Sequence, residues 1–283
     1  MPRARRDLVP YLFLLPGGAW LVIFFVVPML LMLLVSLQEG SLSTGYSLTW
    51  NFAIYPTVIA EFWPQFLRAA FYALLTTILT LLLGFPMAYF IAFRGGRWKT
   101  ALLFVVILPF FVSFIIRTLN WKLLLADNGL LFGPLKEIGL LDPAFHLIAT
   151  PAGVISGLTY NFLPFMVLPL YVALEKIDRR LIEAATDLYA TRRQAFWRIT
   201  FRLALPGIVA GSLLVFIPAV GDFINAELLG SRDTAMIGNI IQFQYLTLND
   251  YPAASALGFV LVALVMLLIV VYVRAVGTEQ LTG

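Results

Sequence analysis

The chain has 283 residues, of which 61% are hydrophobic and only 12% carry a charge, whereas a soluble domain is typically about 25% charged. The mean hydropathy of +0.93 indicates that lipid surrounds much of the surface, so a soluble globular domain is excluded. The lack of cysteine excludes a disulfide scaffold, thiol catalysis and zinc–thiolate sites, and the 24 Phe, 11 Tyr and 6 Trp exclude intrinsic disorder.

Six stretches of the chain are long and apolar enough to cross a membrane, which takes about 20 mostly apolar residues in a helix. In chain order they cover residues 11–37, 70–93, 101–121, 152–174, 207–230 and 253–273. The fifth stretch is interrupted by Pro218, Gly221, Asp222 and Glu227. The sequence therefore predicts an all-α membrane protein in which residues 1–283 form a single transmembrane domain of six helices.

The basic residues are divided unevenly between the two sides of this predicted arrangement. With the N-terminus in the cytoplasm, 14 of the 19 Lys and Arg residues lie on the inner side, which carries a net charge of +8, whereas the outer side carries −4. Basic residues in short loops stay on the cytoplasmic side of a membrane. The distribution predicts that both termini are cytoplasmic, and it accounts for the pI of about 9.4 without a nucleic-acid partner.

The longest inner segment, residues 175–206, is too polar to span the membrane. Asp178 can cap a first helix, Thr191 and Gln194 fit a capping box that begins a second, and Pro206 is tolerated in the first turn of the fifth span. Two interpretations of this helix–turn–helix segment are open: an amphipathic linker that rests on anionic membrane lipid, or a docking element for a cytoplasmic partner. The small side chains in the first helix favour docking slightly, because they let another surface come close.

This inner segment contains Glu183-Ala184-Ala185, then Ile199, and it closes with Pro206-Gly207. The pattern resembles the EAA loop of ATP-binding-cassette importer permeases. The resemblance implies a type I importer permease in which the segment forms coupling helices that dock on an ATPase subunit. The residues that it assigns to this contact are Glu183, Ala184, Ala185, Tyr189 and Ile199. Two positions depart from the family pattern, since Tyr189 stands where the family usually has Gly and Arg202 where it has a first Pro; Tyr189 must turn the chain without the freedom of glycine.

Further stretches along the chain are similar to the spermidine/putrescine permeases and extend the resemblance to nearly its whole length. They are residues 15–17 (LPG), 25–28 (FVVP), 84–89 (GFPMAY), 127–131 (DNGLL), 157–162 (GLTYNF), 163–171 (LPFMVLPLY), 174–178 (LEKID) and 237–241 (IGNII). The resemblance implies a permease subunit of an ATP-driven polyamine importer in the plasma (inner) membrane of a bacterium. Its implied protein partners are an ATPase dimer, a second permease subunit and an external substrate-binding protein. Related permeases carry other organic cations, iron or anions, so a different substrate is the nearest alternative.

Catalytic and cofactor-binding motifs are missing from the sequence. No segment matches the phosphate-binding pattern G-x-x-x-x-G-K-[ST], so ATP and Mg²⁺ would be bound by the partner ATPase and this chain would hold no cofactor. The lone His146 lies in an outer loop without other ligands nearby, so we expect no metal site. No Ser–His–acid set can be assembled, and we predict a transport subunit rather than an enzyme.

Asp222 is the clearest acid inside a span, and an intramembrane acid is a functional candidate because its insertion costs about 2.5–3.5 kcal/mol. We predict that the substrate pathway, which attracts a cationic small molecule, is lined by Asp222, Glu227, Tyr160 and Asn161. The alternative is a buried Asp222 paired with Arg117 or with a backbone donor. The rival function is an ion-coupled secondary transporter or channel with Asp222 or Glu227 as the coupling acid. The scarcity of intramembrane charge and the lack of a visible inverted repeat count against this rival.

Overall fold

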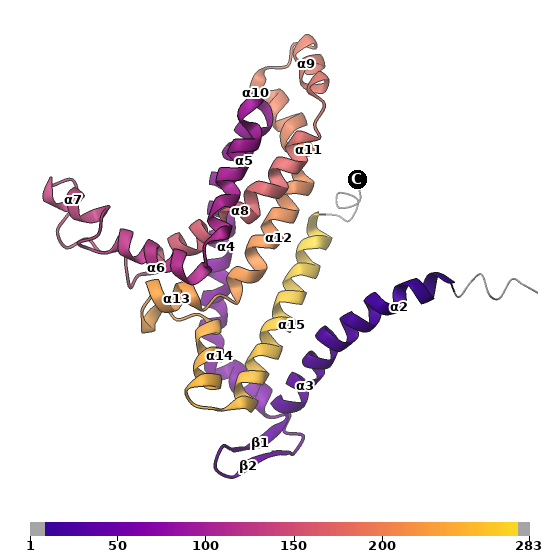
Figure 1. Ribbon diagram of the computed structural model, residues 1–283, viewed down its shortest axis with the longest axis vertical. Helices are drawn as coiled ribbons and strands as arrows, with labels where there is room; N and C mark the ends of the chain where they lie inside the picture. The colour runs from indigo at the N-terminus through magenta and orange to yellow at the C-terminus, as the bar shows by residue number, and fades with distance from the viewer. Residues whose placement is uncertain (1–8, 277–283) are drawn as a thin grey trace, which may run out of the picture. The chain divides into compact units, whose positions relative to one another are not determined.

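The computed structural model describes residues 9–276, and nearly all of its regular structure is helical (Figure 1). The described part also has an antiparallel pair of short strands, β1 (Gln38–Ser41) and β2 (Gly45–Leu48). Within the described residues the chain forms two compact units: the first holds residues 9–63 together with Ile240–Leu264, and the second holds Pro64–Asn239 with residues 265–276. The single transmembrane domain stays a prediction, because compact units of contacts need not be separate domains.

The first unit begins with a nearly continuous helix. Helix α2 (Val9–Leu21), a π-helical turn (Val22–Val26) and α3 (Val27–Ser36) cover the first predicted span. Its apolar side chains are largely exposed from Phe13 to Leu31, as suits a helix that faces lipid. In the same unit the strand pair is anchored to the start of α15 (Tyr251–Val276), since Tyr46 hydrogen-bonds to the Asn249 carbonyl and its ring lies 5.4 Å from that of Tyr251.

Helix α4 (Ile54–Arg94) begins well before the second predicted span, residues 70–93. Its 41 residues rise roughly 60 Å at about 1.5 Å per residue, about twice the thickness of a bilayer's hydrocarbon core. The predicted span covers only the hydrophobic residues, whereas the helix also includes the polar residues Glu61, Gln65 and Arg68. Part of α4 must therefore extend outside the hydrocarbon region.

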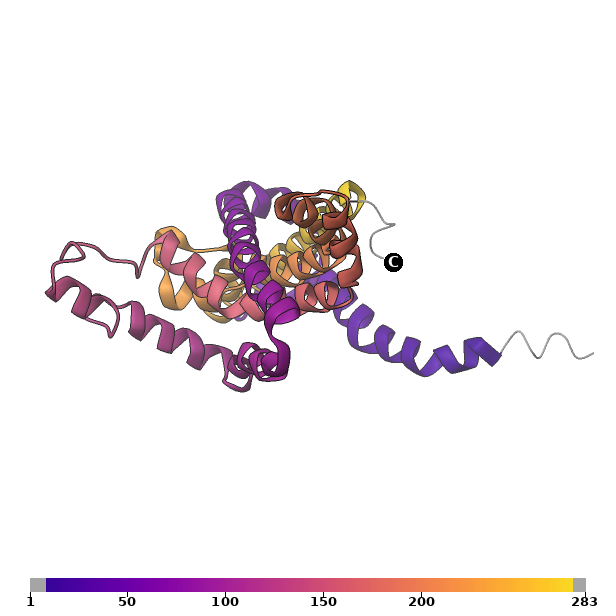
Figure 2. The ribbon, with the colours of Figure 1, turned by 90° about the horizontal axis from the view of Figure 1, so that it is seen from above.

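The third predicted span, residues 101–121, is not one continuous helix, and the prediction was wrong in this respect. Helix α5 (Lys99–Ile107) passes into a 3₁₀ turn (Leu108–Phe111), and the chain is extended at Val112 with a φ of −103° and a ψ of 138°. Helix α6 (Phe114–Leu125) then leaves at 98° to the preceding helix (Figure 2). The break follows Pro109, which has no N–H to continue a helical ladder. Helix α7 (Phe132–Glu137) follows α6 along the same direction (Figures 1 and 2).

The fourth predicted span is confirmed as a helix and the fifth is interrupted. Helix α8 (Pro151–Glu175) begins at Thr150, whose Oγ1 accepts a hydrogen bond of 3.2 Å from the Gly153 N–H. Helix α12 (Leu205–Val220) has Pro206 in its first turn, as predicted, but it ends at Gly221. The short helix α13 (Ile224–Leu229) follows, so residues 207–230 do not form the single helix that was predicted.

The remaining helices are α14 (Ile237–Leu246) and α15, which contains the sixth predicted span, residues 253–273. Of the helices that the structure describes, four are long and apolar enough to cross a membrane, and the total reaches six if each bent helix pair is one span. The predicted all-α membrane architecture is confirmed, with the strand pair as a small addition.

The core of the second unit contains the contact between α8 and α12, which lie side by side (Figure 1). Gly207 and Gly211, four residues apart, share one face of α12. A Cβ at position 207 would stand 2.7 Å from the Pro169 carbonyl oxygen, and one at position 211 would stand 2.7 Å from the Met166 sulfur. The two glycines therefore let the backbones approach closely, as small residues do between membrane helices.

Candidate functional site

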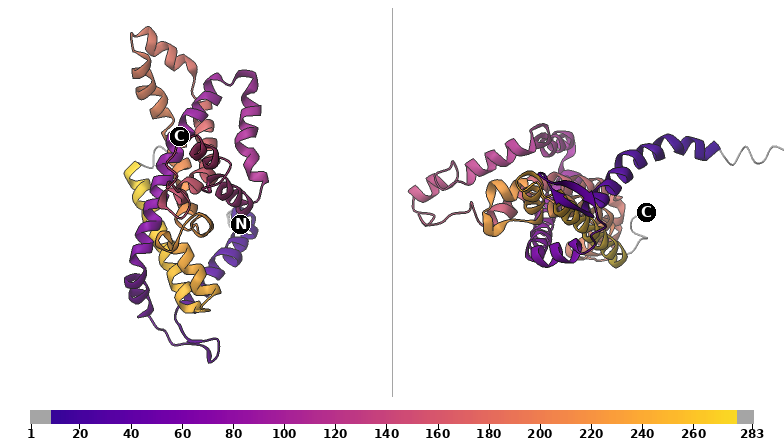
Figure 3. Two further views of the ribbon diagram at one scale, coloured as in Figure 1. Left: turned by 90° about the vertical axis from the view of Figure 1, so that its left-hand side faces the viewer. Right: turned by 90° about the horizontal axis from the view of Figure 1, so that it is seen from below.

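Residues 178–203 form a helical hairpin, which we call the coupling hairpin. Its first arm is α9 (Arg179–Asp187), and its second arm consists of α10 (Arg192–Ala195), a π-helical turn (Phe196–Thr200) and α11 (Phe201–Leu203). The two arms contact each other, and the hairpin stands at one end of the second unit, beyond the neighbouring ends of α5 and α8 (Figures 1 and 3). The predicted helix–turn–helix is confirmed.

The caps that begin the two arms are the ones that the sequence predicts. Asp178 Oδ1 accepts a hydrogen bond of 2.9 Å from the Arg180 N–H. Thr191 Oγ1 accepts from the Gln194 N–H at 3.3 Å, and Gln194 Oε1 accepts from the Thr191 N–H at 2.8 Å, which completes a capping box. Each arm therefore begins at a residue whose side chain bonds within its own first turn.

The turn between the arms places Tyr189 in a backbone conformation that favours glycine. Its φ is +61°, the Tyr189 N–H donates to the Thr186 carbonyl at 3.0 Å, and the Ala190 N–H donates to the Ala185 carbonyl at 3.0 Å. This pair of bonds is the Schellman motif, whose left-handed position is usually glycine. The left-handed conformation costs a residue with a Cβ about 1–2 kcal/mol. Tyr189 thus stands where the importer-permease pattern usually has Gly, and its backbone adopts the left-handed conformation that glycine favours.

The five residues predicted to dock on an ATPase differ in exposure. Glu183 and Ala184 are exposed on α9 and Tyr189 is exposed at the turn, whereas Ala185 and Ile199 are half-buried. The docking assignment stays a prediction. The structure leaves Glu183, Ala184 and Tyr189 as the more accessible residues among the five.

Both arms of the coupling hairpin contact the C-terminal part of α4 within the second unit. Arg179 Nη2 donates to the Phe93 carbonyl at 3.1 Å, and the guanidinium lies 5.7 Å from the Phe93 ring. The Phe196 ring of the second arm lies 5.7 Å from that of Phe85 and 6.0 Å from that of Tyr89. Both arms of the hairpin are therefore packed against α4, a helix that is distant from them in sequence.

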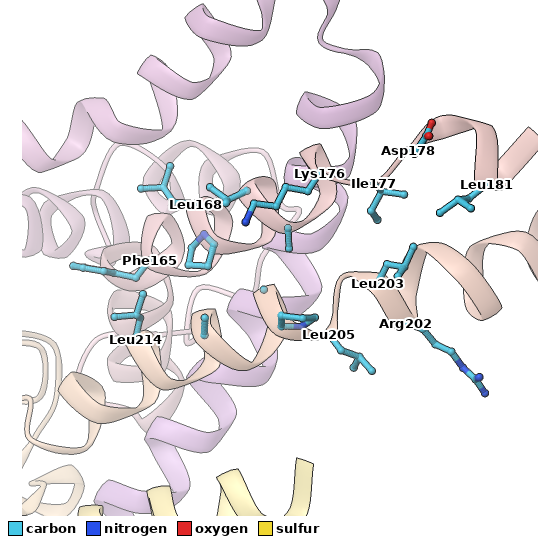
Figure 4. Close-up of a pocket in the computed structure, with 16 residues that line it drawn as sticks. Phe165, Leu168, Lys176, Ile177, Asp178, Leu181, Arg202, Leu203, Leu205 and Leu214 are labelled. Carbon is cyan, nitrogen blue, oxygen red and sulfur yellow. The ribbon is translucent and has the colours of Figure 1, made fainter. Parts of the chain in front are cut away.

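A cavity of about 1050 Å³ lies where the coupling hairpin joins α8 and α12 (Figure 4). Its lining is mostly apolar, and the hairpin contributes Leu181 and Leu203. The charged residues in its lining are Lys176, Arg202 and Asp178, and Asp178 already caps α9. Two of these three charged groups are basic, so the cavity does not suit the cation that the predicted pathway would attract. The cavity does leave room beside the hairpin.

A second group of polar residues, which we call the polar cluster, joins α6, α8 and α13. Asn161 Nδ2 donates to Thr118 Oγ1 and to Asn225 Oδ1, both at 3.0 Å. Asn225 donates from its backbone N–H to Asp222 Oδ1 at 2.8 Å and from Nδ2 to Asp222 Oδ2 at 3.2 Å. Thr118, Asn161 and Asn225 have no exposed surface, and Asp222 is 8% exposed. Because water is excluded, each of these bonds is electrostatically stronger than it would be in solution.

Gly157 on α8 makes room for the polar cluster. A Cβ at this position would lie 2.2 Å from a Leu229 methyl carbon and 2.8 Å from Asn225 Oδ1. The missing side chain therefore lets α13 approach α8 closely enough for Asn225 to reach Asn161.

The sequence leaves two possible partners for a buried Asp222, which are Arg117 and a backbone donor. Asp222 accepts from the backbone and side chain of Asn225, and the predicted alternative of a pair with Arg117 is not formed. Arg117 is 7% exposed and lies 5.6 and 5.5 Å from the rings of Phe110 and Phe114. Both partners of Asp222 are neutral donors, so they hold the carboxylate in place without adding a compensating charge.

The other predicted pathway residues lie in distinct surroundings. Tyr160 stacks on Trp121 with ring centroids 4.7 Å apart and planes within 2°. Glu227 accepts a hydrogen bond of 3.2 Å from Asn239 Nδ2, which also donates to the Phe223 carbonyl at 3.0 Å. The structure thus brings Asp222 and Asn161 into one network, and gives Glu227 and Tyr160 other partners.

Sequence reasoning missed the residues that complete these contacts, which are Thr118, Asn225 and Asn239. The available signal was a polar residue inside an apolar stretch, which marks Asn225 and Thr118 as polar groups that need partners. The break after Gly221 turns Asn225 toward the cluster, and no pattern in the sequence gives the geometry of that break.

A metal site in a protein needs several His, Cys, Asp or Glu side chains placed close together. His146 is exposed, and its ring Nδ1 lies 3.1 Å from the Ala144 carbonyl oxygen. No group of His, Cys, Asp and Glu within residues 9–276 is arranged to hold a metal ion. The candidate sites are therefore the coupling hairpin and the polar cluster.

Comparison with known proteins places this architecture in a family. Residues 80–277 match the profile of the binding-protein-dependent transport system inner membrane component. The chain belongs to this family. The permease is 39% identical over 267 residues to the spermidine/putrescine transport system permease protein PotB of Haemophilus influenzae, covering 91% of this chain and 90% of the relative. It is 36% identical over 257 residues to PotB of Escherichia coli, covering 90% and 94%.

The fold of the permease is shared with a solved transporter. A crystal structure of a bacterial ABC transporter involved in the import of the acidic polysaccharide alginate matches with a TM-score of 0.71 and 23% sequence identity, over 99% of this chain and 98% of that chain. The predicted importer-permease fold is therefore confirmed. As a member of its family the chain is a multi-pass inner-membrane transport component rather than an enzyme.

Proposed function

We propose that this permease is a transmembrane subunit of an ATP-driven polyamine importer. The observation that carries the proposal is the likeness to two proteins named for spermidine/putrescine transport, of which this chain covers 90% and 94%. The lack of a phosphate-binding motif in the sequence agrees with a separate ATPase. Mg²⁺ and ATP would be bound by that subunit, outside this chain.

The proposed partners are an ATPase dimer, a second permease subunit and an external substrate-binding protein. The ATPase would dock on the coupling hairpin at Glu183, Ala184 and Tyr189, with Ala185 and Ile199 supporting the surface from its less exposed side. The hairpin and both termini would lie in the cytoplasm, because 14 of the 19 basic residues are then on the inner side.

The contacts of the coupling hairpin suggest how ATPase motion would reach the membrane helices. The first arm holds the end of α4 through Arg179, and the second arm continues into α12 across a bend of 58°. Since α12 packs closely on α8 at Gly207 and Gly211, a displaced second arm would move these two helices together. Such motion would switch the spans between inward- and outward-facing states.

The substrate pathway is proposed to pass Asp222, Glu227, Tyr160 and Asn161. The hydrogen bonds from Asn225 and Asn239 position the two carboxylates but leave their charge available to a cation. The stacked ring of Tyr160 offers a face for a cation–π contact, which is worth about 0.5–2 kcal/mol. This set would favour an amine and repel an anion.

Reconstitution of the complete complex in proteoliposomes, with its binding protein, tests the proposal. Spermidine or putrescine should stimulate ATP hydrolysis and be taken up, and a non-hydrolysable ATP analogue should stop the uptake. Sulfate serves as the anionic control and should do neither. Uptake that follows an imposed ion gradient and ignores ATP would establish the secondary-transporter alternative. ATP-driven activity that no polyamine stimulates would contradict the substrate class.

A further inference from the structure

The cavity where the coupling hairpin joins α8 and α12 extends from an apolar end to a charged one. Figure 4 shows Phe165 and Leu214 at one end of the cavity, and Arg202 with the first residues of the hairpin at the other. Between Phe165 and Lys176 the chain of α8 rises roughly 16 Å at about 1.5 Å per residue. One leaflet of a bilayer has a hydrocarbon layer about 15 Å thick. The cavity is therefore as deep as one leaflet.

The walls of this cavity are apolar side chains that the rest of the chain does not cover. Val172 on α8, Leu214 on α12 and Leu203 at the end of the second arm all line it, and each keeps about half of its surface exposed. Apolar surface of this kind gains free energy when hydrocarbon covers it. The volume of about 1050 Å³ leaves room for a flexible hydrocarbon chain between the two helices.

The charged end of the cavity suits an anion. Lys176 and Arg202 are exposed lining residues, and neither forms an ion pair within residues 9–276. The carboxylate of the lining, Asp178, accepts a hydrogen bond from the Arg180 N–H at the start of α9, where the helix dipole offsets part of its negative charge. Long basic side chains at helix ends reach the membrane interface, and basic pockets between membrane helices hold acidic lipid head groups.

We propose that the cavity binds one anionic phospholipid from the leaflet on the hairpin's side of the membrane. An acyl chain would lie between α8 and α12, and the phosphate would lie between Lys176 and Arg202. A free phosphate ion would use the two bases but leave the apolar walls uncovered. A zwitterionic lipid would cover the walls but bring a positive group close to the two bases.

The inference goes beyond the proposed function, because it requires neither a polyamine nor an ATPase. It requires only that α8 and α12 cross a membrane. Leu181 of the first arm and Leu203 of the second arm both line the cavity. A bound lipid would therefore contact both arms of the coupling hairpin as well as the two membrane helices, and it would stabilise the place where they join.

A lipid titration of the full-length permease, purified in detergent with the subunits that copurify with it, tests the proposal. Native mass spectrometry counts the molecules of palmitoyl-oleoyl-phosphatidylglycerol that stay bound. Phosphatidylcholine with the same acyl chains isolates the effect of the head group, and glycerol phosphate isolates the effect of the chains. We expect phosphatidylglycerol to bind at least about 5-fold more tightly than phosphatidylcholine, as for one extra favourable charge contact. Glycerol phosphate should not displace it.

Variants of the lining separate the contribution of the charges from that of the walls. Lys176→Gln combined with Arg202→Gln should raise the dissociation constant of phosphatidylglycerol about 30-fold, because two basic contacts with an anionic lipid are lost. Lys176→Arg combined with Arg202→Lys keeps both charges and should bind like the wild type. Val172→Trp fills the cavity from α8 and should also weaken binding. Arg97→Gln removes an exposed base outside the cavity lining and is the control.

Equal binding of phosphatidylglycerol and phosphatidylcholine would overturn the proposal, and so would wild-type affinity in the double glutamine variant or in Val172→Trp. Photocrosslinking gives a second readout that does not depend on affinity. Benzoylphenylalanine at position 172 should crosslink to lipid in vesicles that contain phosphatidylglycerol. Crosslinking of this position to another protein chain would mean that the cavity is part of a subunit interface and that the lipid site is wrong.

Discussion

In the coupling hairpin the capping bonds join residues two or three positions apart, as between Asp178 and Arg180 or Thr191 and Gln194. In the polar cluster, by contrast, Asn161 reaches Thr118 across 43 residues and Asn225 across 64. The hairpin is exposed and the cluster is buried. A substitution in the hairpin should therefore alter what the permease binds, whereas a substitution in the cluster should alter whether its helices hold together.

The two regions also differ in their least favourable feature, which is backbone strain in the coupling hairpin and a buried charge in the polar cluster. The hairpin has one residue, Tyr189, in an unfavourable backbone conformation with a solvated side chain. The polar cluster has a carboxylate, Asp222, whose hydrogen bonds come from Asn225. Replacing Tyr189 by glycine should stabilise the turn, because the backbone strain is relieved. Removing the side chain of Asn225 should leave the buried Asp222 carboxylate with fewer hydrogen-bond donors.

The largest expected effect is in the polar cluster. Asn225→Leu removes the Nδ2 donor to Asp222 and the Oδ1 acceptor of Asn161 while keeping a similar volume. Because a buried carboxylate loses a donor, the free energy of unfolding should fall by about 3 kcal/mol. Denaturant unfolding of the purified permease in detergent measures this change. Asn120→Leu, at an exposed position on α6, is the control and should have little effect; equal effects would mean that the network does not stabilise the fold.

The next effect separates the hairpin from the cluster by function. Glu183→Lys reverses an exposed charge on α9, and a like-charge contact with a partner costs several kcal/mol. ATP-driven uptake should fall about 50-fold, while the free energy of unfolding should change by less than about 0.5 kcal/mol, as for a surface substitution. Glu183→Gln should be milder. Normal uptake and normal ATPase binding by Glu183→Lys would mean that the hairpin is a lipid-surface linker.

The third effect tests whether the polar cluster also serves transport. Asp222→Asn keeps the shape and an acceptor for the Asn225 N–H but removes the charge that would attract an amine. Polyamine uptake should fall roughly 10-fold, since about 1.4 kcal/mol of lost attraction corresponds to that factor. Glu227→Gln should be milder, because that site is predicted to lie nearer water. If Asp222→Asn transports at the wild-type rate but unfolds more easily, Asp222 is a structural acid and the pathway assignment is wrong.

The smallest effect concerns the caps of the coupling hairpin. Asp178→Ala removes the acceptor of the Arg180 N–H and should destabilise the start of α9 by about 1 kcal/mol. Hydrogen exchange in the first turn of α9 should therefore quicken about 5-fold. Tyr189→Gly should have the opposite sign and slow exchange near the end of α9. Unchanged exchange in both variants would show that tertiary contacts, rather than caps, hold the hairpin.

Particular elements show how far the sequence reaches. The fourth span, both hairpin caps and Pro206 at the start of α12 were predicted and are confirmed. The third and fifth spans were predicted as single helices, and both are broken, the third after Phe111 and the fifth after Val220. Hydrophobicity identifies a stretch that can be buried in lipid, but it does not report whether the backbone inside that stretch stays helical.

The residues of the candidate sites likewise fall into those that the sequence identifies and those whose contacts it does not predict. Glu183, Ala184 and Tyr189 could be singled out because they lie in one short segment with a recognisable pattern, and Asp222 because a charge in an apolar stretch is conspicuous. Asn225 could not be paired with Asn161 in advance, since their contact depends on the break after Gly221 and on the missing side chain at Gly157.

The sequence by itself determined the lipid environment, the family resemblance and the local caps, because composition is summed over the chain and caps act within a few residues. The tertiary structure decided the 98° break between α5 and α6, the partner of Asp222 and the exposure of Leu188 and Tyr189 at the turn of the coupling hairpin. These features depend on which distant surfaces meet. A buried carboxylate takes whichever donors packing brings within hydrogen-bond distance, and here the short helix α13 brings Asn225.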